Sequence, residues 1–235
     1  VGDNDEYMAN LGVEIPSSGT YYYASRFKLD LSDYVYGGYS AGGGGFWDGI
    51  DNVSGVLTIN DPVLVITEVM QNPSAVGDSD GEWFEIYNAG GSDVDVDGYI
   101  VTDLGSDNFT INNGGPLMIA AGDFLVFGIN ADMGTNGGVE VDYEYSGFNL
   151  SNGDDEIVVY LPDGTTVVDQ IAWDGGPVWP DPAGTSMTLN PAYFNTVDND
   201  DGTNWYEALT PYGDGDLGTP GAPNDYPLTI WTGAI

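Results

Sequence analysis

The sequence predicts an all-β protein built around a β-sandwich. Short runs rich in Val, Ile, Tyr and Phe are separated by Gly (36 residues), Pro (13 residues), Asn and Asp, as in all-β sandwiches. No stretch has the periodicity of an amphipathic helix. Hydrophobic residues make up 41% of the chain and aromatic residues 13%, enough to build a core and more than an acidic disordered chain contains.

The sequence of residues 1–60 predicts four strands that form a smaller, incomplete β-sandwich. The strands are expected at 6–15, 20–31, 34–39 and 55–60, with a glycine-rich loop at 42–45. Four strands are too few for a complete sandwich, which needs about seven. The segment SSGTYYYASRF (17–27) resembles the late strands of immunoglobulin-like modules, so we expect part of such a domain here.

Residues 61–212 predict a larger sandwich. In Val94-Asp95-Val96-Asp97 the alternation sends valines to one face and carboxylates to the other, as a half-buried strand requires. The expected strands are 63–70, 82–88, 93–102, 109–111, 124–129, 139–145, 156–161, 165–173 and 185–189. The expected core aromatic residues are Trp83, Phe84, Phe127 and Trp173.

The C-terminal residues predict two further segments. GDGDLGTPGAPND (213–225) is rich in Gly, Pro and Asp and reads as a linker without regular structure. YPLTIWTGAI (226–235) carries no charged side chain and reads as a strand.

The charge balance excludes several classes of function. The chain has 38 Asp and Glu residues against only Arg26 and Lys28, and it has no His and no Cys. It therefore has no imidazole base, thiolate nucleophile or disulfide. A net charge of −36 repels nucleic acid and anionic lipid. No apolar run reaches the ~18 residues of a membrane span, so we expect no membrane insertion. A surface this acidic suits salt- or calcium-rich surroundings, so we expect an extracellular protein.

Calcium is the cofactor that the sequence leaves open. Carboxylates spaced i, i+2, i+4 can converge on this ion. The candidates are Asp78, Asp80 and Glu82; Asp198, Asp200 and Asp201; and Asp214 and Asp216. The alternative is that these are ordinary turn residues, because Asp and Gly are common in turns.

No enzyme activity is predicted. Glu82 with Glu85, or Asp154 with Glu156, has the composition of a glycosidase pair, but any acidic chain offers such pairs by chance.

Seven motifs in order resemble a lamin tail domain of the bacterial type over residues ~61–225. They are ITEVMQNP (66–73), DGEWFEIYN (80–88), VDVDGYIVTD (94–103), AAGDFLVFG (120–128), NLSNGDDEIVVY (149–160), VVDQIAWDGG (167–176) and GDLGTPGAPN (215–224). The resemblance implies an immunoglobulin-like β-sandwich. It also implies a binding or structural module without catalytic residues, typically secreted or displayed on the bacterial surface.

Two segments are candidate subunit interfaces. Arg26 and Lys28 share one face of a predicted strand and suit a partner's carboxylates; the alternative is pairing with acids of the same chain. The uncharged C-terminal strand offers Leu228, Ile230, Trp231 and Ile235. This strand could complete the N-terminal sandwich of its own chain, or that of the next copy, which would generate a filament.

Two functions follow from these patterns. The first is a structural subunit of a filament or surface assembly, with copies of itself as partners. The second is an adhesion module that binds carbohydrate or a cell surface through tyrosines. These are Tyr21, Tyr22, Tyr23, Tyr34, Tyr36 and Tyr39.

Overall fold

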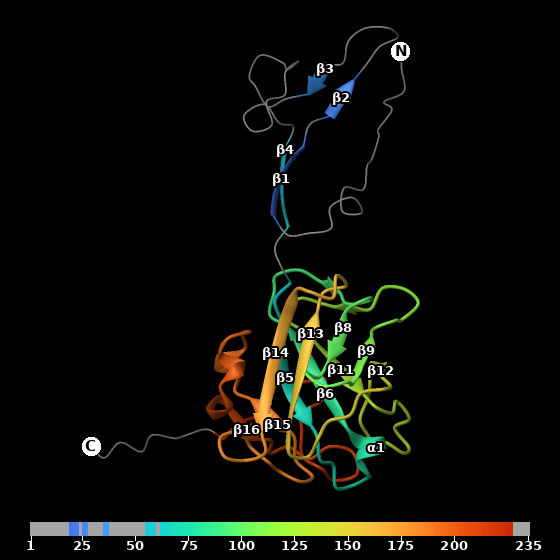
Figure 1. Cartoon of the computed structure of the whole chain (residues 1–235), viewed down its shortest axis with the longest axis vertical. Coiled ribbons are helices and arrows are strands. Elements are labelled where there is room, and N and C mark those ends of the chain that lie inside the picture. Colours follow the sequence, from blue (N-terminus) through green and yellow to red (C-terminus); the bar gives the residue numbers. More distant parts are fainter. Residues whose placement is uncertain (1–18, 24, 28–34, 38–54, 60–61, 228–235) are drawn as a thin grey trace, which may run out of the picture. The chain divides into compact units, whose positions relative to one another are not determined.

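The computed structural model describes residues 19–23, 25–27, 35–37, 55–59 and 62–227 (Figure 1). The chain divides into two compact units, Val1–Asp61 and Pro62–Ile235. The expected strand at 6–15 lies outside the described residues.

The described part of the N-terminal unit consists of two antiparallel pairs. Strand β1 (Gly19–Tyr23) pairs with β4 (Gly55–Ile59), and β2 (Ser25–Phe27) pairs with β3 (Val35–Gly37). The single strand expected at 20–31 is thus represented by β1 and β2, which lie in different sheets.

The C-terminal unit contains a six-stranded and a four-stranded sheet (Figure 1). The larger sheet has the order β12 (Tyr143–Glu144), β11 (Phe124–Gly128), β6 (Trp83–Asn88), β5 (Leu64–Met70), β15 (Met187–Leu189), β16 (Trp205–Glu207). The smaller sheet has the order β14 (Val167–Asp174), β13 (Asp154–Tyr160), β8 (Ile100–Thr102), β9 (Asn108–Thr110).

Short elements lie between these strands. They are the pair β7 (Val94–Asp95) and β10 (Met118–Ile119), helix α1 (Asp78–Gly81) and the 3-10 turns η2 (Pro191–Tyr193), η3 (Asp198–Asp200) and η4 (Gly202–Asn204). Within the described residues, no helix has the length and apolar character needed to cross a membrane.

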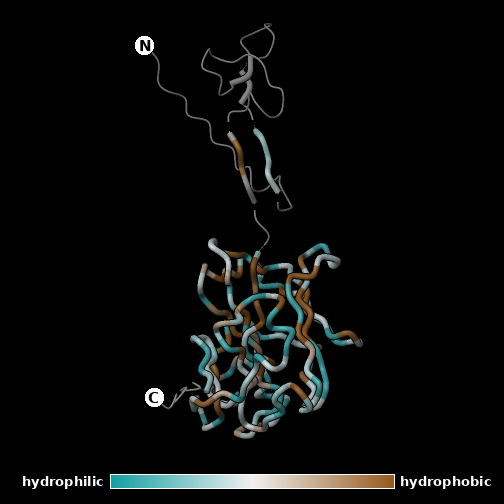
Figure 2. Tube along the Cα trace, turned by 90° about the vertical axis from the view of Figure 1, so that its left-hand side faces the viewer, coloured by the Kyte–Doolittle hydropathy of each residue, from teal (hydrophilic) through white to brown (hydrophobic). Residues whose placement is uncertain are grey.

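The main core lies between the two large sheets. Phe84 stacks on Phe127 with ring centroids 4.9 Å apart, and Trp173 enters the same cluster from β14. The hydropathy colouring follows this arrangement, with hydrophobic segments along the inner strands (Figure 2). The expected burial of Phe84, Phe127 and Trp173 is confirmed.

A second apolar cluster covers the outer face of the six-stranded sheet. Because successive strand residues point to opposite faces, Trp83 turns away from the main core that Phe84 enters. Trp83 packs with Met70, Val126 and Val139, and its Nε1 donates to the Tyr212 hydroxyl at 3.1 Å. The outer face of this sheet is therefore covered by later parts of the chain.

Residues 213–225 supply part of that cover, which differs from the expectation of a linker. Asn224 Nδ2 donates to the carbonyl oxygens of Thr67 (2.7 Å) and Leu189 (3.0 Å), thereby joining β5 to β15. Asp216 accepts from the backbone N–H groups of Ser74 and Ala75. The Gly- and Pro-rich composition therefore reflects an irregular path that is held by side-chain hydrogen bonds.

Candidate functional site

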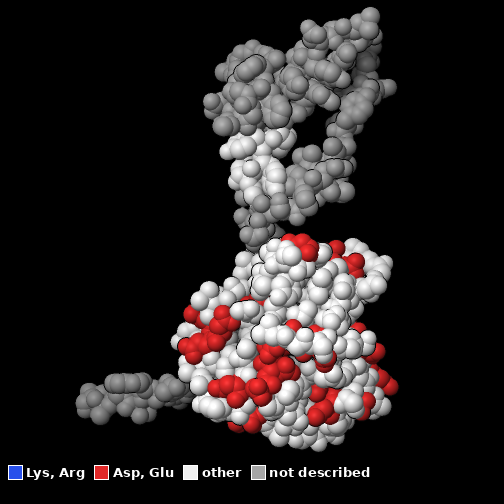
Figure 3. Space-filling view, in the orientation of Figure 1, with Lys and Arg blue, Asp and Glu red and all other residues white. Residues whose placement is uncertain are grey.

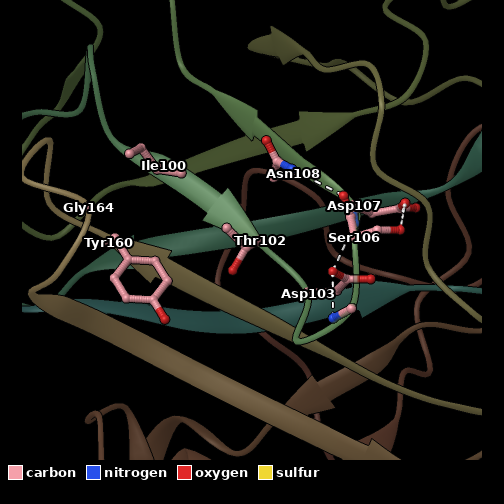
Figure 4. A pocket seen from close by; sticks show the side chains of 9 residues that line it. Ile100, Thr102, Asp103, Ser106, Asp107, Asn108, Tyr160 and Gly164 are labelled. Carbon is pink, nitrogen blue, oxygen red and sulfur yellow. Dashed lines mark hydrogen bonds between the residues drawn. The ribbon is translucent and has the colours of Figure 1, made fainter.

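A shallow pocket of about 290 Å³ opens beside the turn between β8 and β9 (Figure 4). Tyr160 of β13 lies at one end of the pocket, and the turn carboxylates lie at the other. The lining residues are Ile100, Thr102, Asp103, Gly105, Ser106, Asp107, Asn108, Tyr160 and Gly164.

The pocket carboxylates already have hydrogen-bond partners, Asp103 within its own loop and Asp107 in the segment before β13. Asp103 Oδ1 accepts the backbone N–H groups of Gly105 and Asp107, both at 2.9 Å. Asp107 Oδ2 accepts from Asn149 Nδ2 at 2.9 Å. The Asp103–Gly105 contact is that of an Asx turn, so both acids have a structural role besides any ligand.

The chemistry of the pocket suits a neutral polar ligand. The Tyr160 ring supplies an apolar surface, and Thr102 and Asn108 supply hydrogen-bonding groups around it. Asp103 and Asp107 disfavour an anionic ligand.

The first predicted calcium group is dispersed by separate contacts. Asp78 accepts from Asn152 Nδ2 at 3.1 Å, whereas Asp80 accepts from Ser79. Glu82 is buried and accepts the Leu150 N–H at 2.9 Å. Burial raises the pKa of Glu82 to about 7.

The other predicted groups show the same behaviour. Asp198 accepts from Asn195 Nδ2 at 2.8 Å. Asp201 caps η4 by accepting the Thr203 hydroxyl and N–H, and the hydroxyl contact contributes most to lowering the Asp201 pKa. Asp216 is buried on Ser74 and Ala75, while Asp214 is exposed.

Within the part of the chain that the structure describes, no three carboxylates gather closely enough to hold a metal ion. Calcium binding at these residues therefore stays a prediction. The i, i+2 spacing could not reveal that neighbouring N–H groups already occupy several of these oxygens.

Several carboxylates are buried inside the C-terminal unit, a feature that the sequence did not predict. Glu68, Glu85 and Asp169 are at most 3% exposed. Residues 62–227 contain no Lys, Arg or His, so none of these acids has a basic partner within this part of the chain. One signal was available: Glu68 and Glu85 each interrupt an otherwise apolar strand, LVITEVM and WFEIYN.

Glu68 and Glu85 are opposite each other in the β5–β6 register. Glu68 accepts from the Ser186 hydroxyl and from both the N–H and the hydroxyl of Thr219. Glu85 accepts from the Thr67 hydroxyl at 2.9 Å and the Gly221 N–H at 2.7 Å. Burial raises the pKa of Glu68 to about 7 and that of Glu85 well above its usual value.

Asp169 lies at the other side of β5. Its Oδ2 accepts the Ile66 N–H and Asn199 Nδ2, both at 2.7 Å, and thereby ties β14 and η3 to β5. Its Oδ1 has no hydrogen-bond partner among the described residues. Burial raises the pKa of Asp169 to about 7.

The predicted interface residues lie mostly outside the described residues. The backbone of Arg26 lies in β2 opposite Tyr36. Side chains are described for only three of the six candidate tyrosines, those of β1. The residues that fall outside are Lys28, Tyr34, Tyr39, Leu228, Ile230, Trp231 and Ile235.

The path toward the C-terminal tail begins beside β16. Asp225 accepts the Leu209 N–H at 3.0 Å, and the Tyr226 ring lies 6.5 Å from that of Tyr206. The chain thus passes the edge strand of the six-stranded sheet just before residues 228–235.

The described surface is acidic. Figure 3 shows Asp and Glu in separate patches over the visible face of residues 62–227, with white surface between them. With this many like charges, contact between copies needs salt, a bound cation or an uncharged segment.

Comparison with known families agrees with this fold. The model of the Lamin Tail Domain matches residues 59–175. No curated protein and no solved structure matches the chain. The match begins at the end of β4 and ends just after β14, so it includes both central sheets without β15 and β16. The chain therefore contains a lamin tail domain, a β-sandwich whose family model spans residues 59–175.

Proposed function

We propose that the protein is a non-enzymatic, extracellular structural subunit whose copies join by β-strand donation. The observation that carries this proposal is the pairing in the N-terminal unit. Each described strand there has only one described partner, β1 with β4 and β2 with β3. An isolated two-stranded ribbon is marginally stable in water and gains stability from a further strand.

The β1–β4 pair also exposes apolar side chains. Tyr22 and Tyr23 are each 43% exposed, and Val56 of β4 is 55% exposed. A strand added at either edge would bury part of this surface and satisfy backbone groups of the ribbon.

The proposed donor is the tail, residues 226–235. It has no charge in a chain of net charge −36, so it can approach another copy without adding repulsion. Its contact with a different surface of the neighbouring copy is heterologous, and such contacts propagate into filaments unless the rotation closes a ring.

Two observations support the absence of catalysis. The chain has no His and no Cys. Glu85, a member of one glycosidase-like pair, is completely buried and has no access to a substrate. Several surface acids instead cap backbone N–H groups, as Asp103 and Asp201 do.

Light scattering on the full chain and on a variant ending at Pro227 tests the proposal. The full chain should form large assemblies in high salt, and the shortened chain should stay monomeric. Leu228→Asp should weaken assembly, whereas the matched Leu104→Asp on a 75% exposed side chain should not. Unchanged assembly of the shortened chain would exclude tail donation. A monomeric full chain would favour closure of the tail on its own chain.

The pocket beside Tyr160 supports a second candidate, binding of carbohydrate or a cell-surface glycan. Its aromatic ring and polar groups suit sugar hydroxyls. A glycan array on the full chain, with Tyr160→Ala as the matched variant, tests this. Signals that vanish in the variant support binding there, and an array without signals excludes it.

A further inference from the structure

We propose that Glu68 and Glu85 form a pH-sensitive latch that holds residues 217–224 against the outer face of the six-stranded sheet. This inference concerns the C-terminal unit alone and does not depend on assembly. Two adjacent strands place carboxylates at paired positions beneath one loop.

Each carboxylate holds one backbone group of that loop. Glu68 accepts the Thr219 N–H at 2.8 Å, and Glu85 accepts the Gly221 N–H at 2.7 Å. Asn224 adds a neutral anchor on Thr67 and Leu189. The loop therefore depends on the state of both acids.

The hydrogen-bond partners of each carboxylate show which of its two oxygens can be protonated. A backbone N–H only donates, so the oxygens facing Thr219 N and Gly221 N must stay unprotonated. A hydroxyl can donate or accept. Glu68 Oε2, which faces the Thr219 hydroxyl, and Glu85 Oε1, which faces the Thr67 hydroxyl, can therefore carry a proton without breaking a latch contact.

The groups around Glu68 and Glu85 favour the protonated form of both carboxyls. The ionisable groups that face the pair are Asp225, Asp142 and Tyr212, and none of them is cationic. Two ionised carboxylates in this position would repel each other with no cation beside them to offset the repulsion. A raised folded pKa means that stability is present at low pH and is lost as pH rises. For Glu68 the loss spans the range from its ordinary pKa of 4.5 to about 7.

Hydrogen exchange of the Thr219 and Gly221 amides in the full chain tests the latch between pH 5 and 9. After correction for the intrinsic pH dependence of exchange, wild-type protection should fall about tenfold or more per pH unit between pH 5 and 7. Glu68→Gln and Glu85→Gln should each reduce this slope, because an amide mimics the protonated carboxyl. The double variant should remain protected at all pH values.

Glu140→Gln is the matched control, because Glu140 is exposed and the change removes the same charge. It should follow the wild type. A double variant that loses protection as steeply as the wild type, or that is already unprotected at pH 5 with its sandwich intact by circular dichroism, would overturn the latch. Since residues 226–235 follow the latch, its opening would extend the reach of the tail, a consequence that rests on the proposed function.

Discussion

Glu68 and Glu85 lie opposite each other on β5 and β6, both completely buried, and each holds a backbone N–H from the stretch between Thr219 and Gly221. In most proteins a buried carboxylate is paired with a cation. Residues 62–227 contain no Lys, Arg or His. The buried carboxylates are therefore stabilised by hydrogen bonds from hydroxyls and backbone amides, and by protonation.

The pH dependence of global stability should reflect these acids. Burial raises the pKa of Glu68, Glu82 and Asp169 to about 7 each, and raises that of Glu85 well above its usual value. Their protonated forms are favoured by folding, so each acid should lower the free energy of unfolding by about 1.4 kcal/mol per pH unit from pH 5 up to its folded pKa. Urea unfolding at fixed high salt measures this. A stability that rises over this range would contradict the assignment.

Asp169 should separate hydrogen bonding from charge. Asp169→Asn can still accept the Ile66 N–H and Asn199 Nδ2 with its amide oxygen, so it should gain stability relative to the wild type as pH rises. Asp169→Ala removes both acceptors and should cost about 1–3 kcal/mol. Urea unfolding of both variants at pH 5 and 8 checks this, and equal effects of Asn and Ala would contradict it.

Asn224 should tolerate loss of its amide better than conversion to an acid. Asn224→Ala removes two hydrogen bonds to backbone carbonyls and should cost about 1–3 kcal/mol. Asn224→Asp places carboxyl oxygens against the Thr67 and Leu189 carbonyls and should cost more at pH 8 than at pH 5. Thermal unfolding at both pH values measures the difference. If the Asp variant were as stable as wild type at pH 8, the role of Asn224 as a hydrogen-bond donor to both carbonyls would be contradicted.

Replacing Gly213 by any residue with a side chain should destabilise the fold. The φ of Gly213 is +44°, and a Cβ there would lie 1.9 Å from the Gly137 carbonyl oxygen. Gly213→Ala should therefore destabilise the fold by about 2 kcal/mol or more. Gly91→Ala, where a Cβ meets nothing within 4 Å, should change stability by less than about 1 kcal/mol. Similar melting temperatures for the two variants would contradict the close approach of residues 137 and 213.

Strand positions could largely be predicted from the sequence. Runs such as 63–70 and 82–88 correspond to β5 and β6 within one residue, because short runs rich in β-branched and aromatic residues mark buried strands. The run 93–102 failed as one strand because the chain turns at Gly98, φ +87°, between β7 and β8. Strands β10 and β16 were not predicted, because strands of two or three residues are too short to show a periodic pattern.

The cover over the outer sheet face could not be predicted. Alternation places Trp83 and Glu85 on the same face of β6, but it does not say that residues near 212–224 return to cover that face. The hydrogen bonds of Asp216 and Asn224 could not be predicted from composition either. Gly, Pro, Asp and Asn are common both in mobile linkers and in loops that hydrogen bonds hold in place.

Tail donation between copies is tested most directly by cysteine cross-linking, because the chain has no thiol of its own. One preparation carries Val56→Cys in β4 and another carries Ile230→Cys in the tail. After mixing and mild oxidation, the mixture should give a disulfide-linked heterodimer, whereas a mixture of Val56→Cys with Leu104→Cys should not. Without the heterodimer, and with cross-links forming only inside a single chain that carries both Val56→Cys and Ile230→Cys, strand donation between copies would be contradicted.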